Sequence, residues 1–113
     1  MNKKPFQLFF RVIHLFFSSQ NQTQKLVSQS YDRISPGYDD TWTHHMRDLT
    51  AALINKLQIQ PGAKAIDLTC GTGFATDLIA KKTHLNVIGV DASQGMLTQA
   101  RQNHPNCEFI QAD

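Results

Sequence analysis

A glycine turn between an apolar run and a helical pattern is the first feature of this sequence that could do chemistry. Residues 65–74 read AIDLTCGTGF. Gly71 and Gly73 allow a tight turn and let a ligand approach bare backbone. In an open parallel sheet, ligands bind outside the carboxyl end of the first strand, where this turn would lie. Glycines at a strand–helix junction can also be turn residues alone, so the interpretation depends on the residues around them.

Asp67, just before the turn, distinguishes between two classes of ligand. A dinucleotide places its pyrophosphate over such a turn, where a nearby carboxylate would repel it. S-adenosylmethionine (SAM) instead carries an ammonium group and a cationic sulfur, which a carboxylate favours. The third small residue of the dinucleotide fingerprint is also missing, because Thr76 stands in its place. The pattern favours SAM over NAD and disfavours the alternative of a nicotinamide-dependent oxidoreductase.

Two more carboxylates follow later apolar runs. Asp91 ends the run VIGVD, where a carboxylate can accept two hydrogen bonds from a ribose diol. It could also cap a helix that begins near Ser93. Asp113 follows the run CEFIQA and is placed to accept a hydrogen bond from the exocyclic amine of adenine. As the last residue of the sequence, it could instead be frayed.

Alternating strand and helix patterns must position these residues. Short apolar runs rich in branched residues predict strands at 63–68, 85–90 and 107–112, and helical spacing predicts helices at 73–82 and 93–103. Strands separated by helices of this length imply βαβ crossovers and a parallel sheet. The expected fold class is therefore α/β, a Rossmann-like parallel sheet that stops after its third strand.

Further helices are expected before the sheet. Apolar residues recur at helical spacing over 42–57, which predicts a helix that covers one sheet face, with Asp40 or Thr41 as its N-cap. Residues 5–17 hold five of the seven phenylalanines, with basic residues on the opposite stripe. This basic amphipathic helix could lie on an anionic membrane, pack on the protein body or act as a secretory signal. Residues 18–30 resemble a linker or a weak helix.

Composition excludes several other functions. The formal net charge of +2 is too small to argue for nucleic-acid binding, and no apolar stretch is long enough to span a membrane. Cys70 and Cys107 form neither a disulfide framework nor a zinc site, and we expect them to be reduced cytosolic thiols. No metal site is predicted, since His44 and His45 should point to different sides of a helix.

Three motifs in order now establish a resemblance. AIDLTCGTGFAT resembles motif I of the class I SAM-dependent methyltransferases, and VIGVDASQGMLTQAR is similar to their second motif. FIQAD is similar to their adenine-contacting motif. Upstream, YDRISPGYDDTW is similar to the opening of the ubiquinone/menaquinone-biosynthesis C-methyltransferases. The resemblance covers residues 31–113, so we divide the chain into an N-terminal basic amphipathic helix and linker at 1–30 and the N-terminal half of a SAM-binding methyltransferase domain at 31–113.

The resemblance implies roles for individual residues. It implies that Asp91 binds the ribose, that Asp113 meets the adenine and that Tyr38 closes over the cofactor. The methionyl part would be cradled by the turn residues Thr69, Cys70, Gly71, Thr72 and Gly73. Ala92 and Asp67 complete the expected cofactor-binding set, and no catalytic residue is assigned. Thr69 departs from the family pattern, in which many relatives have glycine.

The resemblance also implies a function. The expected activity is methyl transfer from SAM to a small-molecule or lipid-like, quinone-like acceptor, and the alternative is a catalytically inactive fragment that at most binds SAM or pairs with a complementary chain. Family members continue with further strands, so the strand at 63–68 is expected to be an exposed edge through which the chain could self-associate. We expect a cytoplasmic protein, with peripheral membrane contact through residues 4–17 and no nucleic-acid partner.

Overall fold

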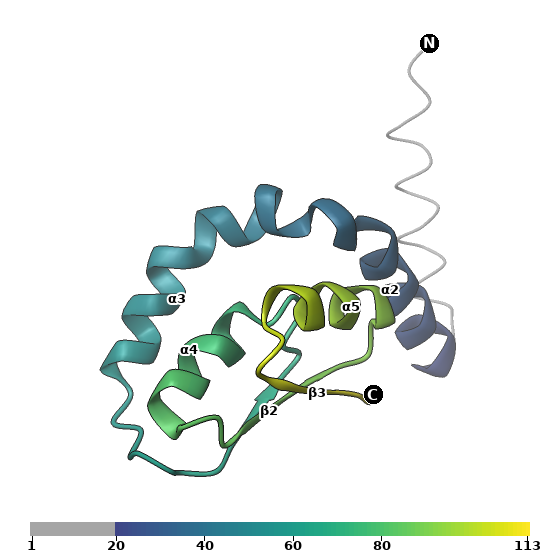
Figure 1. Ribbon diagram of the computed structural model, residues 1–113. Coiled ribbons are helices and arrows are strands. Elements are labelled where there is room, and N and C mark those ends of the chain that lie inside the picture. Colours follow the sequence, from purple (N-terminus) through teal and green to yellow (C-terminus); the bar gives the residue numbers. More distant parts are fainter. Residues whose placement is uncertain (1–19) are drawn as a thin grey trace.

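The computed structural model describes residues 20–113 (Figure 1). The amphipathic helix expected at 5–17 therefore lies outside the described residues. The elements are, in order, α2 (Gln20–Ile34), a 3₁₀ turn η1 (Ser35–Gly37), a π-helical turn η2 (Asp39–Thr43), α3 (His44–Lys56), β1 (Ala65–Leu68), α4 (Phe74–Thr83), β2 (Val87–Asp91), α5 (Gln94–Asn103) and β3 (Glu108–Gln111). Within this part of the chain, no helix is both long and apolar enough to cross a membrane.

The three strands form one parallel sheet in the order β1-β2-β3, which confirms the predicted α/β fold. The register places Asp67 beside Gly89 and Gly89 beside Phe109. Both crossover helices, α4 and α5, lie over the same face of the sheet (Figure 1). The carboxyl ends of β1 and β2, where Leu68 pairs with Val90, therefore lie side by side at one edge of this layer.

The opposite face of the sheet is bare among the described residues. The side chains of Ile66 and Leu68 are 66% and 71% exposed, and Ile110 is exposed too. As predicted, β1 is an edge strand in the described sheet, paired with β2 on one side. Successive side chains of β1 point to opposite faces of the sheet. Ala65 and Asp67 are therefore half-buried beneath the helices, whereas Ile66 and Leu68 are exposed on the other face.

For the described part of residues 18–30, one of the two interpretations is confirmed, and one expectation about the next helix was wrong. Residues 20–34 form α2, so the helix rather than the linker is correct for this stretch, and α2 continues across position 30. The helix predicted at 42–57 does not cover the sheet, because α3 packs on the outer side of α4 (Figure 1). The apolar stripe of the predicted helix is exposed and consists of Trp42, Met46, Leu49, Leu53 and Leu57.

The expected N-cap of α3 was wrong as well. Neither Asp40 nor Thr41 caps the helix, because the backbone enters α3 in helical conformation from η2. Tyr38 and Thr43, the residues before η2 and α3, both have helical dihedral angles and make no side-chain capping bond. A helix that follows another helical turn has backbone carbonyl partners for its first N–H groups, so it needs no side-chain cap.

The core beneath the glycine turn is built around Phe109. Its ring is 7% exposed and packs with Cys70, Leu97 and Ala100. Gly89 on the neighbouring strand makes room for it, because a Cβ at Gly89 would lie 2.6 Å from the Cδ1 atom of the ring. This close packing couples β3 and β2 to the turn after β1.

Candidate functional site

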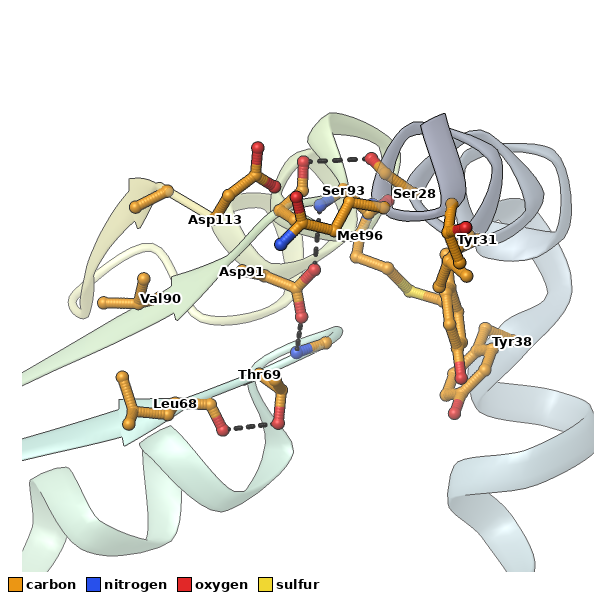
Figure 2. A pocket seen from close by; sticks show the side chains of 16 residues that line it. Ser28, Tyr31, Tyr38, Leu68, Thr69, Val90, Asp91, Ser93, Met96 and Asp113 are labelled. Carbon is orange, nitrogen blue, oxygen red and sulfur yellow. Dashed lines mark hydrogen bonds between the residues drawn. The ribbon is translucent and has the colours of Figure 1, made fainter. Parts of the chain in front are cut away.

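A cavity of about 800 Å³ lies at the carboxyl ends of β1 and β2 (Figure 2). Its volume falls in the range of roughly 300–1,000 Å³ that is typical of small-molecule sites. Strand ends and the glycine turn form one wall, and α2 with Tyr38 forms the other. The lining residues are Thr23, Gln24, Val27, Ser28, Tyr31, Tyr38, Leu68, Thr69, Gly71, Val90, Asp91, Ala92, Ser93, Met96, Ala112 and Asp113.

The Asp91 carboxylate is the centre of the site (Figure 2). One of its oxygens accepts a hydrogen bond from the Gly71 N–H at 2.8 Å, and the other accepts from the Ser93 N–H at 2.9 Å. Asp91 therefore fixes the glycine turn against the start of α5. Each carboxylate oxygen has a second lone pair, so both can still accept a hydrogen bond from a ligand diol in the cavity.

Ser93, rather than Asp91, is the N-cap of α5. Its hydroxyl accepts from the Met96 N–H at 3.1 Å, as an N-cap side chain does. Asp32 in α2 strengthens this cap, since one of its oxygens accepts both from the Ser93 hydroxyl at 2.6 Å and from the Gly95 N–H at 2.8 Å. The capping role that the sequence left open for Asp91 is therefore wrong, and α2 is held to the start of α5 through Asp32.

Six of the ten predicted site residues line the cavity, namely Tyr38, Thr69, Gly71, Asp91, Ala92 and Asp113. The other four, Asp67, Cys70, Thr72 and Gly73, are not among the lining residues. Cys70 points into the core, where burial raises the pKa of its thiol to about 12. Thr72 is 3% exposed, and its hydroxyl donates to Asp39.

Asp67 lies behind the turn instead of within the cavity. Its carboxylate accepts a hydrogen bond from the Thr76 hydroxyl at 2.6 Å, beneath α4. Burial raises the pKa of the Asp67 carboxyl, and the negative charge of Asp91 raises it further, while the hydrogen bond from Thr76 opposes both effects. Asp67 therefore contributes negative potential to the site without lining it.

The raised pKa of Asp67 predicts a pH-dependent cost to folding. When the pKa of a carboxyl is higher in the folded chain than in the unfolded chain, ionisation favours unfolding. The folded chain therefore loses stability as the pH rises from the ordinary pKa of the carboxyl, here 3.8, through its pKa in the folded chain. Asp67→Asn removes this titration and keeps an oxygen that can accept from Thr76. We expect the variant to melt at a higher temperature than the wild type at pH 7 and to lose that advantage below pH 4. Thermal melts across this pH range, with the exposed Asp40→Asn as control, measure the effect; parallel curves would contradict it.

Thr69 adopts a backbone conformation that suits glycine. Its φ of 58° lies in the left-handed region, and its hydroxyl donates to the carbonyl oxygen of Leu68 at 2.6 Å. A Cβ in this region costs about 1–2 kcal/mol, and a β-branched residue adapts poorly to it. The departure from glycine noted in the sequence is therefore a site of backbone strain in the cavity wall.

Thr69→Gly should relieve this strain. The greater freedom of glycine in the unfolded chain offsets roughly 0.5–1 kcal/mol of the gain, so we expect a net stabilisation of about 0.5–1 kcal/mol. Urea denaturation measures the change. Thr69→Ala retains the Cβ and should show no such gain, and equal stabilisation by alanine and glycine would show that backbone strain is not the cause.

The wall formed by α2 was not foreseen from the sequence. Tyr31 and Tyr38 lie across the cavity from the strand ends, with ring centroids 6.2 Å apart (Figure 2). Ser28 donates from α2 to the carbonyl oxygen of Ala92 at 3.1 Å. The signal in the sequence was the repeated pair Tyr31-Asp32 and Tyr38-Asp39. In both pairs the tyrosine lines the cavity, and the aspartate bonds to the body of the fold.

The electrostatics of the site suit a ligand with positive charge. Asp91 and Asp113 line the cavity, and Asp67 lies close behind it. Burial raises the pKa of the Tyr38 hydroxyl, and electrostatic interactions with Tyr31, Asp91 and Asp39 raise it further, so this tyrosine stays neutral and can donate a hydrogen bond. Among residues 20–113, no cluster of His, Cys, Asp and Glu could hold a metal ion.

Comparison with known proteins matches the part of the chain that holds the three strands and the glycine turn. Residues 65–113 match the family described as a methyltransferase domain. The ubiquinone/menaquinone biosynthesis C-methyltransferase UbiE of Campylobacter jejuni subsp. jejuni (strain 81-176) is 30% identical over 108 residues, which cover 80% of this chain and 44% of that protein. The trans-aconitate 2-methyltransferase of Enterobacter sp. (strain 638) is 41% identical over 64 residues, or 56% of this chain and 25% of that protein. The chain therefore spans less than half the length of these relatives.

The fold has a close counterpart among solved structures. The DhpI-SAM-HEP complex superimposes with a TM-score of 0.64 at 25% identity and covers 85% of this chain and 45% of that protein. The fold is thus shared with a solved protein over most of the chain.

Proposed function

We infer that the chain belongs to the class I SAM-dependent methyltransferases, and we propose that its 800 Å³ cavity binds SAM for methyl transfer to a small apolar acceptor. SAM supplies an electrophilic methyl group on a sulfonium, and transfer requires the acceptor atom to be held in line behind it. The described residues would bind and orient the cofactor. We assign no residue of this chain to the methyl-transfer step.

The geometry of Asp91 carries this proposal. The carboxylate faces the cavity at the end of β2, held by two backbone N–H groups, with a free lone pair on each oxygen for a ribose diol. Gly71 brings bare backbone to the same wall, where a methionyl group can approach. The surrounding carboxylates favour the ammonium and sulfonium of SAM and oppose a pyrophosphate.

Titration calorimetry with SAM, S-adenosylhomocysteine (SAH) and NAD tests the cofactor assignment. We expect SAM and SAH to bind in the micromolar range and NAD to show no measurable heat. Binding of NAD that is as tight as binding of SAM would contradict the proposal and restore the oxidoreductase alternative.

A second, smaller cavity supports the choice of an apolar acceptor. It has a volume of about 260 Å³ and is lined by Ser30, Tyr31, Ile34, Tyr38 and Trp42. Tyr31 and Tyr38 line both cavities, so a ligand in the second cavity would lie next to the cofactor. Among the described residues no charged side chain lines it, which favours a quinone-like ring over a polycarboxylate such as trans-aconitate.

Methyl transfer is tested by incubating the chain with radiolabelled SAM and either a naphthoquinol or trans-aconitate. The proposal expects label in the naphthoquinol, and a Trp42→Ala variant should raise the KM for the quinol with little change in affinity for SAM. Labelled trans-aconitate would contradict the apolar acceptor. SAM binding without turnover on any acceptor would support the alternative of a catalytically inactive fragment.

We propose in addition that the protein is cytoplasmic and contacts membranes through residues 4–17, whose phenylalanines and basic residues suit an anionic surface. Flotation with anionic vesicles tests this contact. A chain without residues 1–19 should stay unbound, and equal flotation of both chains would exclude this segment as the anchor.

Self-association through β1 is a separate proposal. Its outer edge, which no strand among residues 20–113 pairs with, and the exposed side chains of Ile66 and Leu68 support pairing with a second copy of the chain. Sedimentation velocity should show a dimer that Ile66→Lys disrupts. A monomer at all concentrations would contradict the proposal.

A further inference from the structure

Asp39 joins three parts of the chain that are distant in sequence. Its Oδ1 accepts hydrogen bonds from the hydroxyls of Thr72 and Thr43, the latter at 2.7 Å. Its Oδ2 accepts from the side-chain amide of Asn103 at 2.7 Å. One carboxylate thus connects η2, the glycine turn and the last residue of α5.

The residues that directly precede Asp39 and Thr72 line the cavity. Tyr38, which precedes Asp39, forms part of the wall that contains Tyr31. Gly71, which precedes Thr72, forms part of the opposite wall. The bond between Asp39 and Thr72 therefore links the two walls one residue behind the cavity. Asp91 holds the turn through Gly71 from the side of the sheet, and Asp39 holds it through Thr72 from the side of the helices.

The surroundings of Asp39 and Thr72 favour a strong hydrogen bond between their side chains. Thr72 is 3% exposed and Asp39 is half-buried, so water competes little for the bond between them. Hydrogen bonds to an ionised carboxylate are stronger than those between neutral groups. A π-helical turn such as η2, which Asp39 begins, is rare and occurs frequently at functional sites.

We propose that Asp39 is a positioning residue of the SAM site, which fixes the glycine turn relative to the Tyr31–Tyr38 wall through the hydroxyl of Thr72. The inference rests on the proposed cofactor function. Asp39 does not line the cavity, so its effect on the cofactor passes through the turn and through Tyr38. Asp40, the next residue, is exposed and provides a matched control of equal charge.

Variants at both ends of the bond test the proposal. Asp39→Ala and Thr72→Val, which replaces the hydroxyl with a methyl group of similar size, should each weaken SAH binding about tenfold in calorimetry. Thr72→Ser keeps the donor and should recover most of the affinity. The double variant Asp39→Ala/Thr72→Val should bind no more weakly than Asp39→Ala alone, because both changes remove the same link. Asp40→Ala should bind as the wild type does.

A measurement without ligand separates this inference from the proposed function. Hydrogen exchange of the Gly71 and Thr72 amides should accelerate in Asp39→Ala and in Thr72→Val, at a temperature where both variants are folded, and remain unchanged in Asp40→Ala. Faster exchange in a chain that does not bind SAH would overturn the cofactor assignment alone. Unchanged exchange and SAH affinity in Asp39→Ala, or additive losses in the double variant, would overturn the role of Asp39.

Discussion

Asp91→Ala is expected to lower the affinity of the chain for SAM by about a hundredfold or more. The change removes the acceptor of two backbone N–H groups. It also removes the two acceptor sites that we propose for the ribose diol. Each partly buried group left without a partner costs about 1–3 kcal/mol, and about 2.8 kcal/mol corresponds to a factor of a hundred. Titration calorimetry with SAM and SAH measures the loss.

Asp113→Ala is the matched control at the same edge of the sheet. Asp113 lines the cavity but is exposed, so its loss should cost at most about one neutral hydrogen bond, or roughly fivefold in affinity. A dideoxyribose analogue of SAH separates direct from indirect effects of Asp91. If Asp91 binds the ribose, the wild type and Asp91→Ala should differ less for this analogue than for SAH. An equal difference for both ligands would show that Asp91 acts only by holding the turn.

Gly73→Ala is expected to destabilise the chain by about 2–5 kcal/mol, which approaches the whole stability of a small domain. Two effects add at this residue. Its φ of 85° is unfavourable for any residue with a Cβ, and that Cβ would lie 2.8 Å from the Cζ atom of Phe109. The Phe109 ring is buried and cannot move aside without disturbing its neighbours in the core. Urea denaturation at equilibrium measures the effect.

Alanine substitutions at three other glycines separate the effect of backbone strain from the effect of steric overlap with Phe109. Gly62 has a φ of 76° with open space around its position, so Gly62→Ala should cost about 1–2 kcal/mol through backbone strain alone. Gly89 has an ordinary φ but a contact of 2.6 Å with Phe109, so Gly89→Ala should cost about 1–3 kcal/mol through overpacking alone. Gly37 has neither, and Gly37→Ala should change stability by less than about 0.5 kcal/mol. A cost at Gly73 no greater than that at Gly62 would show that the Phe109 ring yields easily.

The strand–helix alternation from residue 63 onward was correctly predicted, because its signals are local. Branched apolar runs such as Val87–Asp91 and the glycines of the turn determine their own backbone conformations. Ser93 is a further local signal, since an N-cap acts within one helical turn. The order β1-β2-β3 follows from the βαβ connections, which place successive strands side by side.

The N-terminal helices show where local signals fail. The stripe from Trp42 to Leu57 has the spacing of a buried helix face, yet its residues are exposed in the described fold. Periodicity shows that one face of a helix is apolar, but it does not identify what that face contacts. The actual contact of α3 with α4 includes Arg47, whose guanidinium lies 5.1 Å from the centre of the Phe74 ring. A contact between residues this far apart in the sequence produces no periodic pattern, so the sequence does not predict it.

The sequence by itself determined the α/β fold, the glycine turn and the carboxylate at the end of β2, because each depends on the chemistry of a few consecutive residues. Only the tertiary structure decided which of these residues line the cavity. It turned Asp67 and Thr72 away from the cavity and brought Tyr31 and Asp39 to the site from helices that precede the sheet. The placement of Thr72 and of the wall formed by α2 depends on contacts between residues 33 to 64 positions apart, which local sequence patterns do not encode.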